Sequence, residues 1–160
     1  MSALRGGSGV ILARFLPLLT LLSVFGIDRL TKRLAQSHLI YGEPRPVLPF
    51  FNLTYLENTG AAFGMGRDMN KFFIGLSIAI LVALFVYARK LGADKLGEKT
   101  ALALVVGGAL GNLYDRITHG SVIDFLDFYA GSHHWPAFNV ADSSILVGAC
   151  LLAISQWKTK

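Results

Sequence analysis

The chain has 160 residues, of which 53% are hydrophobic and only 16% are charged, and its mean hydropathy is positive. This composition is too apolar for an ordinary soluble domain of that length, and it predicts one integral membrane domain over residues 1–160. The formal net charge is +5, but the Lys and Arg residues are scattered between apolar runs, which argues against a nucleic-acid partner.

Four apolar segments stand out along the chain. The first covers residues 10–27, is interrupted only by Arg14, and ends in a charged stretch that suits an uncleaved span better than a cleaved signal peptide. The others cover residues 72–88, 100–114 and 143–157. With flanking residues added, they predict transmembrane helices at about 10–30, 70–89, 99–117 and 139–158.

The connection over residues 43–66 differs in character from these segments. It contains three prolines, the β-branched and aromatic stretch FFNLTYL and then a glycine-rich turn, so it predicts a small β-rich platform. The later segment DFLDFYA, which starts at Asp124, is expected to form a short interfacial helix. The expected fold class is an all-α membrane protein with four transmembrane helices, with the platform and the interfacial helix on its outer side.

The number of spans also predicts an orientation. With four spans, both termini lie on one side, and the connections 28–71 and 117–138 lie on the other. Four cations fall in the short loop 89–99 and none between residues 117 and 138. This asymmetry favours cytoplasmic termini, with the polar residues of the two connections facing outward.

Polar residues gather near the ends of the first and third helices. Asn112 is three residues before Asp115 and four before Arg116, so it shares a helical face with each of them. A polar helix end that reaches for water would explain part of this cluster. Asp28 stands four residues before Lys32, which fits an ion pair at a helix end as well as it fits a functional site.

Two acids, Asp124 and Asp142, are brought to one membrane face by the last helical hairpin. Asn139 is a plausible N-cap, which places Asp142 at the third helical position, where the helix dipole favours an anion. That position explains Asp142 structurally, but it does not explain Asp124. Two carboxylates that share one proton can act as general base and general acid, which is the chemistry of an aspartic protease.

Other catalytic schemes fit the sequence less well. His133 and His134 are adjacent and lack the spacing of a zinc-binding motif. Ser143 lacks the glycine setting of a nucleophilic serine. Cys150 is expected to be a small buried hydrophobe away from any base. The glycine-rich GGALGN lies inside a helix and predicts close helix packing.

Five motifs occur in one order along the chain: DRLTK from Asp28, NTGAAFG from Asn58, GGALGNLYDR from Gly107, VIDFLDFY from Val122 and FNVADSS from Phe138. With these motifs, the chain resembles the lipoprotein signal peptidases of bacteria, also called signal peptidase II, over nearly its whole length. The resemblance implies an aspartic endopeptidase of the bacterial inner membrane that removes the signal peptide from lipidated prolipoproteins. It would cut just before a cysteine modified with diacylglycerol.

By the same resemblance, Asp124 and Asp142 are the catalytic pair. Globomycin-type cyclic peptides are the expected inhibitors, the expected partners are the lipidated prolipoprotein and membrane lipid, and no metal or other cofactor is expected. The residues expected to bind substrate or to support the pair are Asp28, Lys32, Asn58, Gly60, Asn112, Asp115, Arg116 and Asn139.

A different class of function stays open at this point. In a small proton-coupled transporter or channel, Asp124, Asp142, Asp28 and Arg116 would form a proton path. Such transporters usually have repeat symmetry, which this sequence lacks. A purely structural membrane protein would have no use for the pair of acids.

Overall fold

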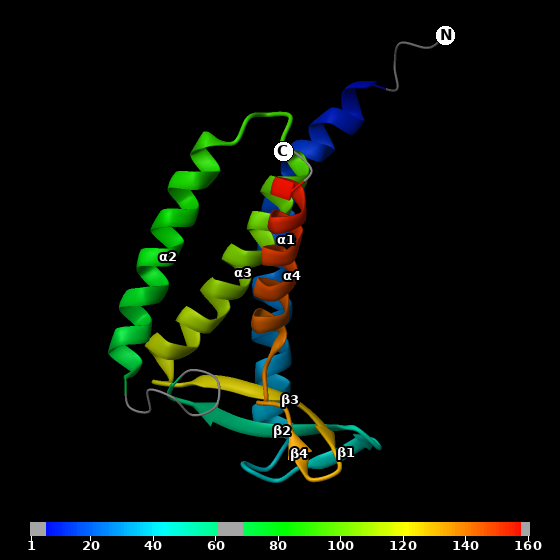
Figure 1. The fold of residues 1–160 in the computed structure, drawn as a ribbon, viewed down its shortest axis with the longest axis vertical. Coiled ribbons are helices and arrows are strands. Elements are labelled where there is room, and N and C mark those ends of the chain that lie inside the picture. The colour runs from blue at the N-terminus through cyan, green and yellow to red at the C-terminus, as the bar shows by residue number, and fades with distance from the viewer. Residues whose placement is uncertain (1–5, 61–68, 158–160) are drawn as a thin grey trace.

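The computed structural model describes residues 6–60 and 69–157, which form four helices with a small sheet across one end (Figure 1). The helices are α1 (Gly6–His38), α2 (Asn70–Lys90), α3 (Leu96–Thr118) and α4 (Val140–Trp157). The strands are β1 (Arg45–Leu48), β2 (Phe51–Asn58), β3 (Val122–Ala130) and β4 (His133–His134), and neighbouring strands pair antiparallel in that order. The end of the NTGAAFG motif and the predicted glycine-rich turn fall partly in residues 61–68, outside the described residues.

The helices expose apolar side chains and bury charged ones. Leu30 and Leu146 are 58% and 66% exposed, whereas Asp28 and Lys32 are completely buried. This distribution reverses that of a water-soluble protein. By length and composition, α2 and α4 qualify as membrane spans among the described residues, while the number of spans stays a prediction.

Helix α3 packs against both α1 and α4, and its glycines make the close approach possible. A Cβ atom on Gly107 would lie 3.0 Å from the Leu21 carbonyl oxygen of α1. On α4, a Cβ atom on Gly148 would lie 2.6 Å from the Ala101 carbonyl oxygen of α3. The prediction of close helix packing at the glycine-rich stretch is therefore confirmed.

The predicted platform is confirmed as the four-stranded sheet, but the predicted interfacial helix is wrong. Residues 122–130 form strand β3, which pairs with β2 in a register that places Asn58 opposite Val122 and Phe51 opposite Phe128. The segment is rich in β-branched and aromatic residues, which suit a strand once a partner is present. The ring centroids of Phe51 and Phe128 are 4.7 Å apart, so the pair adds side-chain contact to the backbone ladder.

The expectation for Cys150 is also wrong, because this residue is exposed on α4. The buried face of α4 passes through Ala141 and Gly148. Two residues beyond Gly148, the helix has turned by about 200°, so Cys150 points away from α3. The surface that it shares with Leu146 and Leu151 is apolar.

Candidate active site

Asp142 is held at the start of α4 by a reciprocal pair of hydrogen bonds. The backbone N–H of Asp142 donates to Asn139 Oδ1 at 2.9 Å, and the backbone N–H of Asn139 donates to Asp142 Oδ2 at 3.2 Å. This arrangement is a capping box, with Asn139 as the N-cap and Asp142 at the third helical position. The N-cap expected from the sequence is therefore confirmed.

Asp124 lies on β3 and is 4% exposed. Its Oδ2 accepts a hydrogen bond from Asn58 Nδ2 of β2 at 3.1 Å, and its Oδ1 accepts one from Asn139 Nδ2 at 2.8 Å. Burial, followed by the nearby charge of Asp142, raises the pKa of Asp124 to about 7, although the two amide donors act in the opposite direction. At neutral pH this carboxyl is therefore divided between its acid and its anion.

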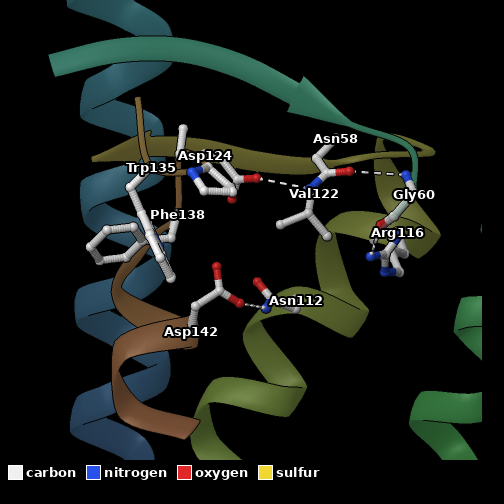
Figure 2. Close-up of a pocket in the computed structure, with 11 residues that line it drawn as sticks. Asn58, Gly60, Asn112, Arg116, Val122, Asp124, Trp135, Phe138 and Asp142 are labelled. Carbon is white, nitrogen blue, oxygen red and sulfur yellow. Dashed lines mark hydrogen bonds between the residues drawn. The ribbon is translucent and has the colours of Figure 1, made fainter. Parts of the chain in front are cut away.

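The two acids face one another across a cavity of about 260 Å³, as Figure 2 shows. Asp124 reaches it from the sheet, and Asp142 reaches it from the first turn of α4. The Asn139 side chain joins them, since its amide nitrogen bonds Asp124 and its oxygen accepts the Asp142 N–H. The residues that line the cavity are Asn58, Gly60, Asn112, Arg116, Val122, Asp124, Trp135, Pro136, Ala137, Phe138 and Asp142.

Helix α3 contributes Asn112 and Arg116 to the cavity. Asn112 Nδ2 donates to Asp142 Oδ1 at 2.8 Å, and Arg116 Nη2 donates to the Gly60 carbonyl oxygen at 2.9 Å. The backbone N–H of Gly60 donates in turn to Asn58 Oδ1 at 3.0 Å. The bonds of Arg116 and Gly60 connect the end of β2 with α3, whereas the Asn112 bond connects α3 with α4.

Behind the cavity, Lys32 of α1 is completely buried and has three polar partners. Its Nζ lies 2.9 Å from Asp28 Oδ2, 2.8 Å from Asp115 Oδ2 and 2.8 Å from Asn112 Oδ1. Arg29 also pairs with Asp115. The ion pair between Asp28 and Lys32 that the sequence suggested is present, and it belongs to a larger buried cluster of two acids and two bases.

Each acid of this buried cluster also holds the residue before one of the facing carboxylates. Asp28 Oδ1 accepts the backbone N–H of Ala141 at 3.0 Å, and Asp115 Oδ2 accepts the backbone N–H of Ile123 at 3.4 Å. Asp28 and Asp115 do not line the cavity, but each accepts a hydrogen bond from a segment that carries one of the two facing acids. Of the ten expected site residues, these two and Lys32 form the supporting layer, six others line the cavity, and Asn139 bonds to both acids.

Sequence reasoning missed the wall formed by Trp135, Pro136 and Ala137. The wall directly precedes Phe138, whose backbone N–H donates to the Leu126 carbonyl oxygen at 3.1 Å, which brings this segment alongside β3. Its position just before the FNVADSS motif was the available signal.

Comparisons with known proteins identify the family of this chain. The family described as Signal peptidase (SPase) II matches residues 20–158. The chain belongs to the signal peptidase II family. All ten residues named as site candidates lie within the matched range.

Individual relatives cover most of the chain. The lipoprotein signal peptidase of Vibrio cholerae is 41% identical over 145 residues, which cover 87% of this chain and 85% of the relative. That of Photorhabdus laumondii is 44% identical over 135 residues, with 82% and 81% covered. A bacterial membrane enzyme solved by the in meso method at 2.3 Å resolution superposes with a TM-score of 0.82 at 35% identity, covering 89% of this chain and 87% of its own.

The buried cluster generates a prediction about stability. Lys32→Met keeps most of the side-chain volume but leaves Asp28 and Asp115 without their shared cation. Breaking a buried ion pair in this way typically costs about 3–5 kcal/mol, so the free energy of unfolding in detergent micelles should fall by an amount of this order. Asp28→Asn added to Lys32→Met should recover part of the loss, because it removes one of the stranded charges.

Lys71→Met is the matched control for this test. Lys71 is exposed at the start of α2 and takes part in none of the ion pairs found among the described residues, so its removal should change the stability little. A Lys32→Met variant that unfolds at the same denaturant concentration as the control would contradict a stabilising role for the cluster.

Proposed function

We propose that this signal peptidase II family member is an aspartic endopeptidase that removes the signal peptide from diacylglyceryl-modified prolipoproteins and cuts before the lipidated cysteine. The observation that supports it best is the pair of carboxylates, Asp124 and Asp142, that face one cavity and are joined by Asn139. The relatives in the comparisons are themselves described as lipoprotein signal peptidases.

In the proposed mechanism, the two acids have different tasks. Asp142 accepts hydrogen bonds from the Asn112 amide and from the Asn139 backbone, and it stands at a helix N-terminus, so these contacts favour its anion against the cost of burial. We assign it as the general base that takes a proton from the attacking water. Asp124, with a pKa of about 7, starts as the acid and donates its proton to the scissile carbonyl oxygen as the water oxygen bonds to carbon.

Breakdown of the resulting tetrahedral intermediate completes the reaction. The proton on Asp142 passes to the leaving amine as the C–N bond breaks, and the hydroxyl proton of the intermediate returns to Asp124. The pair therefore ends the cycle with one shared proton, as it began. Arg116 and Asn112 line the same cavity and would position the peptide against the two acids.

We further propose that all four helices span the bacterial inner membrane, with the sheet and the two acids at its outer surface. A signal peptide that lies in the bilayer would then present its cleavage site where water can reach the carboxylates. Globomycin-type cyclic peptides, the inhibitors expected from the resemblance, would occupy the same cavity. Neither step of the scheme uses a metal ion.

The direct test replaces each acid by its neutral isostere. Asp124→Asn and Asp142→Asn should each reduce cleavage of a purified lipidated prolipoprotein to background, because Asn can neither accept nor release the required proton. Asp127→Asn is a control on the same strand, since Asp127 is buried but bonds Asn52 and His134 rather than the cavity. Substantial turnover by either of the first two variants would contradict the proposed mechanism.

The raised pKa of Asp124 predicts the alkaline limb of the pH profile. As the pH rises through about 7, Asp124 loses the proton that it must donate, so the single-turnover rate of the wild type should decline above neutrality. At acid pH the rate should decline again when Asp142 takes up a proton. A rate that stays constant from acid to alkaline pH would rule out a shared proton, and Asp127→Asn should keep the wild-type profile.

The orientation can be tested with reporter fusions. A reporter inserted between Gly92 and Gly97, in the connection between α2 and α3, should report a cytoplasmic position. A reporter at Gly131, in the turn between β3 and β4, should report the outer side. The two insertion points lie at opposite ends of the helices (Figure 1), so the opposite pattern would invert the topology and place the acids in the cytoplasm.

A further inference from the structure

A second cavity lies at the end of the helices away from the sheet. Helix α2 packs chiefly against α3, and in Figure 1 the two helices diverge toward this end. Between α1, α2 and α3 the space amounts to about 410 Å³. Its walls are mostly apolar and include Leu21, Leu84, Phe85 and Val106. It shares no lining residue with the cavity of the two acids.

Two cations, Arg14 and Lys99, stand at one end of this cavity. Arg14 comes one turn before Leu18 in the N-terminal part of α1, and Lys99 comes one turn before Leu102 in the first turn of α3. Within the described residues neither cation makes an ion pair. An apolar cavity between helices, with these two cations at one end, has the shape and charge to bind an acyl chain that ends in an anionic head group.

We propose that this cavity binds one anionic phospholipid of the inner leaflet, with an acyl chain between α1, α2 and α3 and the phosphate against Arg14 and Lys99. Basic pockets between transmembrane helices on the cytoplasmic side suit anionic head groups. The inference rests on the four-span orientation proposed above. The substrate's signal peptide is the poorer occupant, because its positively charged N-terminal region would lie at the same depth as the two cations.

The test is a titration of the full-length protein in nonionic detergent with dioleoylphosphatidylglycerol or dioleoylphosphatidylcholine, followed by native mass spectrometry. One saturable site with a preference for the anionic lipid is expected. Arg14→Gln combined with Lys99→Gln should weaken phosphatidylglycerol binding about 30-fold, since each cation near an anionic head group accounts for roughly five-fold.

Two further variants test whether lipid binding depends on these two cations and on the cavity itself. Lys71→Gln combined with Lys90→Gln removes the same charge from exposed positions of α2 outside the cavity and should leave the affinity unchanged. Ala88→Phe fills the cavity but keeps both cations, and it should also weaken binding. Equal affinity for the two lipids, or an equal loss in the Lys71 and Lys90 control, would overturn the proposal.

Cleavage measured in phosphatidylcholine vesicles separates this proposal from the proposed function. The cavity variants should cleave a lipidated prolipoprotein like the wild type, because the cavity is remote from the two acids. A raised KM in Ala88→Phe would assign the cavity to the signal peptide and overturn the lipid site. A wild-type protein that binds phosphatidylglycerol selectively but does not cleave would refute the proposed function and leave the lipid site standing.

Discussion

The site depends on one buried cation, the ammonium group of Lys32. It lies within 2.9 Å of oxygens from Asp28, Asp115 and Asn112, and therefore joins α1 to α3 at the level of the cavity. Such a cluster is stable in a low-dielectric interior only when every charge has its partner. Because Asp28 and Asp115 also accept backbone N–H groups from α4 and β3, the ion pairs that balance the charges also position the segments that carry the two facing acids.

The two facing acids differ because their surroundings differ. Asp142 is built into a helix N-terminus and receives a backbone N–H and the Asn112 amide. Asp124 sits on a strand, where burial and the neighbouring carboxylate raise its pKa to about 7. Environments that separate two carboxyl groups in this way are the usual basis for dividing acid and base tasks. Asn139 bonds to both acids and so joins strand β3 to the start of α4.

Local patterns in the sequence predicted much of the fold correctly. The two structural predictions that were wrong failed for physical reasons. The four helices match apolar runs, and the FFNLTYL stretch forms a strand as its residues predict. The segment DFLDFYA from Asp124 was expected to be helical, but it lies in strand β3. The prediction failed because its partner strand β2 is more than 60 residues away in sequence, so local residues do not reveal the pairing. Cys150 was expected to be buried because its neighbours are apolar, but in a chain with an apolar exterior that property does not distinguish inside from outside.

The sequence by itself determined which residue types gather at one end of the helices, the N-cap at Asn139 and the order of motifs that marks the family, because these depend on spacing along the chain. Only the tertiary structure decided how these residues divide into layers. Asp115 turns toward Lys32 while Arg116, the next residue, lines the cavity, and residues 135–137 close its other wall. Those positions depend on contacts between distant segments, where the choice of partner is made by packing and charge neutralisation rather than by local periodicity.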